Sequence, residues 1–262
     1  MNFNFKNVVV NLYYILNDRY YRYSNIIIKK IFGKNFVDAN LVRRGGKVID
    51  KFEAPSKNPT GLALEGKTYL WHCDAFSGKI YRLDLATRRI DRTFKAPTDH
   101  PWGLAWDGET LWNTDDLKGI LYQIDPEDGS VIKSFEYPNT DLHGLAYDGE
   151  YIIATDRINC MFYWIDTETG EIVRKIPTPT YNPRAESGGL SYDGKYLWHS
   201  NGTEATIYII NPANGTTIGK VQLMKTHPHD LAWIQDMTIY IAIRNLRSIY
   251  KIKVELRLGE EG

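Results

Sequence analysis

The chain lacks several features that would narrow its class at once. It has two cysteines, Cys73 and Cys160, in 262 residues, and they lie in different repeat units, so no disulfide framework is expected. Its 32 basic and 32 acidic side chains cancel, which gives no electrostatic case for binding nucleic acid or an anionic membrane surface. The one strongly apolar run, residues 8–16, is shorter than a membrane span, which needs about 20 residues. No signal-peptide cleavage site follows it, so the sequence predicts a cytoplasmic protein without a transmembrane segment.

What the chain does contain is one short pattern written five times. Four copies begin with Gly-Leu-Ala or Gly-Leu-Ser, and a degenerate fifth copy begins with Asp-Leu-Ala. The copies start at Gly61, Gly103, Gly144, Gly189 and Asp230, so the period is 41 to 45 residues. A fixed period of this size indicates a repeat architecture, because one unit alone cannot bury its apolar face.

Each unit has the pattern of four short strands. In the second copy these are residues 103–106, 110–114, 119–124 and 130–137, rich in aromatic and β-branched side chains. Asp-Gly pairs suit a tight hairpin between the first two strands, and the Asp-Pro-x-x-Gly stretch at 125–129 suits the turn before the fourth. With no helical period between units, the sequence predicts an all-β, five-bladed propeller of four-stranded blades.

The fifth unit has only three strands before the repeats end, at residues 230–233, 238–243 and 248–254. A strand-like stretch at 46–55 precedes the first unit and matches the fourth strands of the others. We expect residues 48–52 to pair with 251–254 and complete the last blade, which removes two open sheet edges. The predicted domain is therefore 46–258. Residues 1–45 form a short extension, with helical character around 20–32, that either packs against the propeller or anchors it to a partner or membrane surface.

Propellers bind ligands at the mouth of the central channel, and this analogy places the candidate site. The residue just before each innermost strand differs between blades, which scaffold duties do not require. The candidate catalytic residues are His143, His229 and Glu186. The candidate ligand-binding residues are Trp102, His100, Asp99, Asp141, Arg184 and His227. As rim residues, His143 and His229 are expected to be exposed. The same face also receives Asp116, Arg157 and Arg244.

Two other groups of polar residues are predicted to belong to the scaffold. Asp74, Asp115, Asp156 and Asn201 end the second strand of successive blades, where each can accept backbone N–H bonds from the next loop. His72 and His199 precede two of these positions and are expected to be buried between blades. Histidines and carboxylates on one rim can ligate a metal or transfer protons, or each can cap its own loop. No spacing is typical of a metal site, so no metal ligand is assigned and the cofactor stays open.

The repeat resembles the blades of NHL-type, YncE-like and virginiamycin-lyase-like propellers, and over residues 46–254 it is most similar to the plant-type glutaminyl cyclotransferases. That resemblance implies five blades, and it rests on the Trp-Gly-Leu-Ala-x-Asp-Gly-x-x-Leu stretch from Trp102 to Leu111. The family's Thr-Gln-Gly-Leu stretch is Pro-Thr-Gly-Leu here, at 59–62. Its catalytic Glu-Ser-Thr-Gly motif is replaced by Trp-His-Cys-Asp, at 71–74. Cyclase activity is therefore not implied, and only Trp102 transfers as a pocket aromatic.

Two hypotheses follow. The first is a propeller that binds a small molecule or peptide at the channel mouth, as an enzyme of that group or as a binding protein. The alternative is a non-catalytic protein-interaction scaffold. A pocket lined by Trp102, His143, His229 and Glu186 favours the first hypothesis, whereas a plugged channel with an apolar surface patch favours the second.

Overall fold

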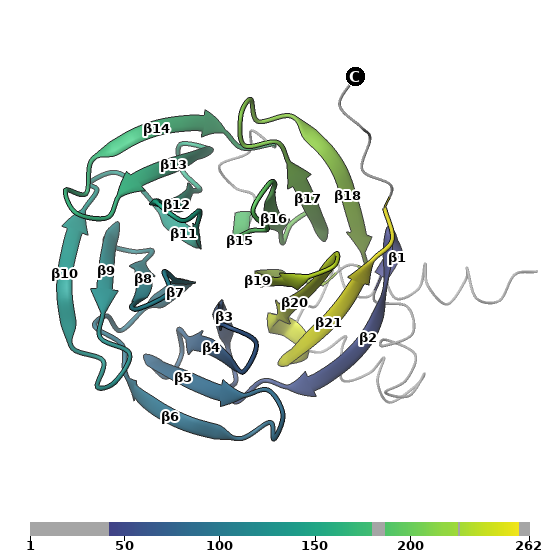
Figure 1. The fold of residues 1–262 in the computed structure, drawn as a ribbon, viewed down its shortest axis with the longest axis horizontal. Helices are drawn as coiled ribbons and strands as arrows, with labels where there is room; N and C mark the ends of the chain where they lie inside the picture. Colours follow the sequence, from purple (N-terminus) through teal and green to yellow (C-terminus); the bar gives the residue numbers. More distant parts are fainter. Residues whose placement is uncertain (1–41, 180–186, 225, 257–262) are drawn as a thin grey trace, which may run out of the picture.

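The computed structural model describes residues 42–179, 187–224 and 226–256, and these form five sheets arranged radially around one axis (Figure 1). The first sheet contains β3 (Pro59–Glu65), β4 (Tyr69–Asp74), β5 (Lys79–Asp84) and β6 (Ile90–Lys95), and the second contains β7 (Pro101–Trp106), β8 (Leu111–Asp115), β9 (Ile120–Ile124) and β10 (Val131–Glu136). The third contains β11 (Leu142–Tyr147), β12 (Tyr151–Asp156), β13 (Met161–Asp166) and β14 (Ile172–Pro177), and the fourth contains β15 (Ser187–Tyr192), β16 (Leu197–Asn201), β17 (Thr206–Ile210) and β18 (Thr217–Leu223), joined by β1 (Val42–Arg44). The fifth contains β19 (Pro228–Gln235), β20 (Thr238–Ile243), β21 (Ser248–Val254) and β2 (Gly46–Glu53). We number these blades one to five. The predicted five-bladed propeller is confirmed.

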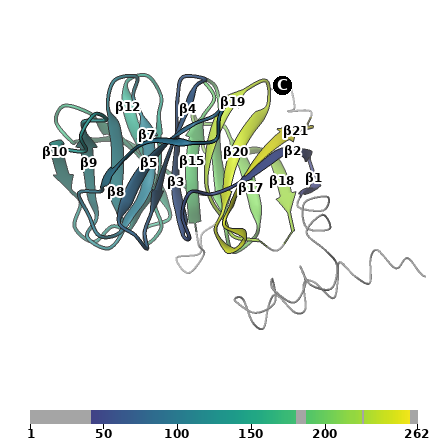
Figure 2. The same cartoon turned by 90° about the horizontal axis from the view of Figure 1, so that it is seen from below.

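Blade five is built from both ends of the described chain. Its outer strand β2 runs antiparallel to β21, with Gly46 opposite Val254 and Glu53 opposite Ser248. The predicted closure is therefore confirmed, and the pairing extends beyond the residues expected. In the side view the strands of all blades cross the thickness of a disc (Figure 2).

Blade four has a fifth strand that the sequence did not indicate. β1 pairs with β18 through Val42 opposite Leu223, and the chain then crosses directly to β2 at the edge of blade five. Gly45 sits at the crossing with φ +85°, and its carbonyl accepts the N–H of Glu255 at 2.8 Å. Residues 42–44, assigned above to the extension, thus link two blades. The rest of the extension, with its expected helical part, lies outside the described residues.

In blades two and four the repeated motif joins the first hairpin to the second strand. In blade two the carboxylate of Asp107 accepts the backbone N–H groups of Glu109 and Thr110, and Nε1 of Trp112 donates to it at 2.7 Å. Trp112 is fully buried. The same bond joins Asp193 to the buried Trp198. The aspartate of the Asp-Gly pair therefore fixes both the hairpin turn and the tryptophan of the second strand.

The innermost strands approach each other closely around the axis because their first repeated residue is glycine. A Cβ added to Gly103 would lie 2.0 Å from the carbonyl oxygen of His143, so no side chain fits there. The fifth copy departs from this rule with Asp230, which is 2% exposed. Its carboxylate accepts the backbone N–H groups of Leu62, Leu190 and Leu231, which belong to the innermost strands β3, β15 and β19.

The axial channel is therefore closed at mid-height by a single buried carboxylate. Helical structure among the described residues is the 3-10 turn η1 (Arg244–Leu246), and none of it is long and apolar enough to cross a bilayer. The predicted cytoplasmic location stays a prediction.

Candidate functional site

A cavity of about 170 Å³ opens at the end of the axis where the innermost strands begin. Blades two to five contribute to its wall through the starts of β7, β11, β15 and β19 and through the loops that follow β8, β12 and β20. Its lining residues are Trp102, Asp116, His143, Arg157, Gly188, Pro228, His229 and Arg244. We call this space the rim cavity.

Trp102 is the central side chain of the rim cavity. Its ring centroid lies 4.8 Å from that of His143 and 4.7 Å from that of His229, and His100 stacks on it at 5.4 Å with the planes 15° apart. Three histidines from blades two, three and five thus surround one indole. Nε1 of Trp102 is buried and donates no hydrogen bond to any described residue. A buried N–H without an acceptor is costly, so this atom is a place where a ligand acceptor would be stabilised.

Arg244 brings positive charge to the same cavity. It follows β20 directly, as the first residue of η1, and its guanidinium carbon lies 5.8 Å from the centroid of Trp102. Its Nε donates to Oδ1 of Asn58, and its Nη1 is 3.5 Å from Nε2 of His229. Within the described part of the chain no carboxylate forms an ion pair with it. Its charge is therefore held in place without being neutralised.

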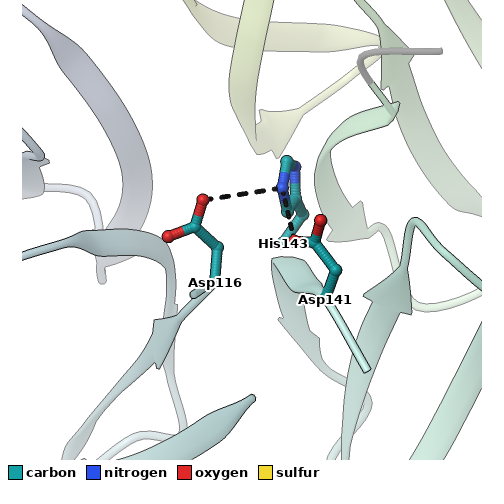
Figure 3. A group of neighbouring side chains, drawn as sticks. All are labelled: Asp116, Asp141 and His143. Carbon is teal, nitrogen blue, oxygen red and sulfur yellow. Dashed lines mark ion pairs between the residues drawn. The ribbon is translucent and has the colours of Figure 1, made fainter. Parts of the chain in front are cut away.

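Asp116, Asp141 and His143 form a compact group on the other side of the cavity (Figure 3). Nε2 of His143 lies 2.9 Å from Oδ1 of Asp141 and 3.9 Å from Oδ2 of Asp116. The second oxygen of each carboxylate is bound from outside the group. Nδ1 of His100 is 2.5 Å from Oδ1 of Asp116, and Arg157 donates through Nε, at 2.8 Å, and through Nη2 to Oδ2 of Asp141.

The two carboxyl groups differ in their electrostatic surroundings. Burial raises the pKa of Asp116, and the hydrogen bond from His100 offsets only part of that effect. Burial also acts to raise the pKa of Asp141, but the contacts with His143 and Arg157 outweigh it and the net shift is downward. Asp141 is therefore the more firmly ionised of the two. Such a histidine between two unequal carboxyl groups can transfer a proton or, with them, coordinate a cation.

The structure brings together five of the nine residues named from the sequence. Trp102, His143 and His229 line the cavity. His100 and Asp141 do not line it, but they bind the lining residues Asp116 and Arg157, respectively. Asp99 is not part of the cavity wall, since its side chain is 92% exposed and pairs with Lys95 at 3.3 Å. His227 also does not line the cavity, but its carbonyl oxygen accepts the N–H of Arg244. Arg184 and Glu186 lie outside the described residues.

The expected exposure of the two rim histidines is wrong. His143 is 3% exposed and His229 is 6% exposed, because Trp102 and the neighbouring innermost strands cover them. Substituting either will therefore change packing as well as binding.

The scaffold assignments are confirmed. Oδ1 of Asp115 accepts the N–H groups of Leu117 and Lys118, and Asp74 and Asp156 make the same pairs in their own blades. His72 and His199 are fully buried. Cys73 and Cys160 are buried and form no disulfide.

Three cavity residues were placed on this face by the sequence but not selected as candidates. Asp116, Arg157 and Arg244 each come directly after the last residue of a second strand. At that position the other blades have Ala75 and Gly202. The signal that could have found them is this variation from blade to blade, which is the same argument that selected Trp102 and His143.

Comparison with solved structures places the fold among known propellers. The glutaminyl cyclase of Myxococcus xanthus superposes with a TM-score of 0.70 at 16% identity, covering 82% of this chain and 99% of that one. Virginiamycin B lyase from Staphylococcus aureus, in a catalytically inactive form with one histidine replaced by alanine and with quinupristin, gives a TM-score of 0.50 at 20% identity, covering 78% and 68%.

The β-propeller domain of Cps50 (Swd1) from Myceliophteria thermophila gives 0.51 at 11% identity, covering 80% and 99%. The chain shares the propeller fold of these proteins. No protein-family model matches it, and no curated protein matches its sequence. Because enzymes and a protein named only for its propeller domain superpose on the chain, the fold does not choose between the two hypotheses.

Proposed function

We propose that the rim cavity binds a small molecule or the end of a peptide through a carboxylate group. The observation that carries the proposal is Arg244, a partly buried cation with no ion-pair partner in the described chain, set beside the indole of Trp102. A guanidinium presents paired N–H donors that match the two oxygens of a carboxylate.

The size of the cavity limits the ligand. At about 170 Å³ it is smaller than the roughly 300–1,000 Å³ of sites that enclose a drug-sized molecule. It therefore suits a small carboxylic acid or the last residue of a peptide chain. Two ionisable side chains, His143 and His229, stand against the same indole and supply the proton-transfer groups that an enzyme would need. Glutaminyl cyclase and virginiamycin B lyase are enzymes on this fold, which supports but does not require catalysis here.

The test compares acids with their matching amides. A panel of small carboxylic acids and short peptides, each paired with its primary amide, is screened by thermal shift and followed by calorimetry. We expect at least one acid to bind and its amide to bind more weakly by about tenfold or more, since a charged hydrogen bond is worth about 1.5–3 kcal/mol. Arg244→Gln should remove the difference between acid and amide. Equal binding of acids and amides, or no binding by any acid, contradicts the proposal.

The scaffold alternative is favoured by a separate observation on the face of the disc that carries the rim cavity. Phe76, Leu117 and Ile158 occupy the same position in blades one to three, two residues after the end of the second strand, and they are 80%, 72% and 52% exposed. An apolar arc of this kind can join two copies of the chain. Sedimentation of the full chain tests it. Self-association that disappears when all three are changed to Ser supports the arc, and a monomer before and after the change contradicts it.

A further inference from the structure

The group of Asp116, Asp141 and His143 has the arrangement of a metal-coordinating centre. One donor atom from each residue lies within 4.8 Å of the others, and the set is one imidazole nitrogen with two carboxylate oxygens. Ligand atoms about 2.0–2.2 Å from a tetrahedral ion lie about 3.4 Å apart. Side-chain movements on the order of 1 Å would therefore place all three donors on one ion.

The carboxylates are oriented from outside the group. His100 holds the outer oxygen of Asp116, and Arg157 holds the outer oxygen of Asp141, so the inner oxygen of each is directed to the side where Nε2 of His143 lies (Figure 3). Outer partners that fix a ligand's orientation in this way are typical of metal sites.

The inner oxygen of Asp141 gives an independent indication. Asp141 is 95% buried, yet its Oδ1 accepts no hydrogen bond from any described residue. Nε2 of His143 is 2.9 Å away, close enough for an ion pair, but the angle does not make a hydrogen bond. An ion about 2.1 Å from both atoms, to one side of the line that joins them, would give Oδ1 of Asp141 the partner that it lacks.

We propose that Asp116, Asp141 and His143 bind one divalent cation of the Zn²⁺ or Mn²⁺ type at the wall of the rim cavity. Imidazole suits Zn²⁺ and its neighbours, whereas carboxylates also suit Mn²⁺, and the mixed set disfavours Mg²⁺ and Ca²⁺, which prefer oxygen alone. Three protein ligands leave a coordination position open, as in catalytic zinc sites, and Asp116 and His143 both line the cavity.

The charges of the site are compatible with such an ion. Arg157 neutralises one of the two carboxylates, so a dication would leave the group with a net charge of about one positive unit. The open position would then attract an anion, on the same side of the disc as Arg244. The metal proposal rests on the three ligands alone and does not require the carboxylate ligand proposed above.

The experiment uses the full chain, stripped of metal with a chelator, and titrates it with ZnCl₂ alone in a calorimeter. We expect one Zn²⁺ per chain and a higher melting temperature when the ion is in excess, because binding to the folded state stabilises it. Co²⁺ in place of Zn²⁺ should give visible absorption bands typical of nitrogen and oxygen coordination. MgCl₂ should bind much more weakly.

Two variants and one control identify the site. Asp116→Asn and His143→Gln should each weaken Zn²⁺ binding by about tenfold or more, on the scale seen when groups around a metal are removed. Asp99→Asn makes the same chemical change on an exposed residue of the same rim and should bind Zn²⁺ as the unchanged chain does. Because Asp116→Asn leaves His143 in place, it decides the matter if His143→Gln folds poorly. No Zn²⁺ or Mn²⁺ binding by the unchanged chain, or equal binding by Asp116→Asn, overturns the proposal.

Discussion

The two ends of the axial channel are built by different rules. At one end each innermost strand finishes with a large side chain three residues after the first repeated position. These side chains are Leu64, Trp106, Tyr147, Tyr192 and Trp233, and they line a cavity of about 130 Å³. At the other end the residues one position before the repeat are Thr60, Trp102, His143, Gly188 and His229, with no common chemistry. The first end repeats a packing solution, whereas the second places a different group in each blade.

The difference separates positions that serve the packing of every blade from positions that do not. A position that every blade fills alike answers a need that every blade shares, which is to close the ring around the axis. A position that varies is free of that need, and four of the five blades place a residue of the variable end in the wall of the rim cavity. The comparison can be tested by changing residues at each end and between them.

The largest change in stability is expected when the pH is lowered, because of the two buried histidines of the scaffold. Burial lowers the pKa of His72 and of His199 to about 4. Both are therefore neutral in the folded protein but gain a proton near pH 6.5 when it unfolds, so stability is full above pH 6.5 and falls as the pH drops towards 4. The loss should reach about 3 kcal/mol for each histidine. Chemical denaturation at a series of pH values measures it.

A matched variant assigns this effect to its source. Blade two has Asn113 where blade one has His72, so His72→Asn fits the scaffold and should make the stability less dependent on pH. An unchanged pH profile in this variant would show that other groups cause the acid sensitivity.

The next effect concerns Asp230, which lies between the two ends. Its two oxygens accept three backbone N–H groups, and an asparagine would turn an N–H donor towards some of them. We expect Asp230→Asn to lower the free energy of unfolding by about 2–4 kcal/mol, since each buried donor left without an acceptor costs about 1–3 kcal/mol. Urea denaturation of the two proteins is the measurement. A loss under about 0.5 kcal/mol, the usual cost of a surface change, would show that the carboxylate does not brace the strands.

A smaller effect is expected at the repeated end. Trp106 is partly buried and stacks on Trp71 with their ring centroids 6.5 Å apart. Trp106→Ala should cost about 2–3 kcal/mol, somewhat less than the 3–5 typical of a fully buried tryptophan. Zn²⁺ affinity at the rim cavity should stay the same. A loss of that affinity in a protein that still folds would contradict the separation of the two ends.

The smallest effect on stability is expected at the variable end. His229→Ala should lower the free energy of unfolding by about 1–2 kcal/mol because the ring is buried against Trp102. Binding of any carboxylate ligand should fall more than stability does. Calorimetry and denaturation of the same sample separate the two quantities, and a stability loss with unchanged binding would remove His229 from the site.

The fold could be predicted from the sequence because its determinants are local and repeated. Asp107 and Trp112 sit five residues apart, and the same pair recurs at Asp193 and Trp198, so the pattern of one blade can be recognised in another. Strand β2 could be recognised by its likeness to the other fourth strands. Strand β1 could not, because three residues carry too little pattern.

The site was only partly predictable because its groups meet through the ring closure. The variable positions before the innermost strands led to Trp102, His143 and His229. They did not reveal that Asp116 and Asp141, 25 positions apart in sequence, would each place one oxygen within 4 Å of Nε2 of His143. The same limit applies to Asp230, whose place in the sequence looked like a degenerate glycine rather than an axial brace.

The closure of blade five has a consequence for how the protein is made. Strand β21 is the last propeller strand to leave the ribosome, while its partner β2 emerges first among the strands of that blade. Until synthesis reaches β21, β2 has no partner and the edge of blade one lacks a neighbour around the axis. From the synthesis of β2 until that of β21, nascent chains of this propeller therefore expose unpaired strand edges, which favour chaperone binding and aggregation. Ring closure then has to wait for β21, and a pause anywhere between β2 and β21 would lengthen the period in which β2 lacks its partner.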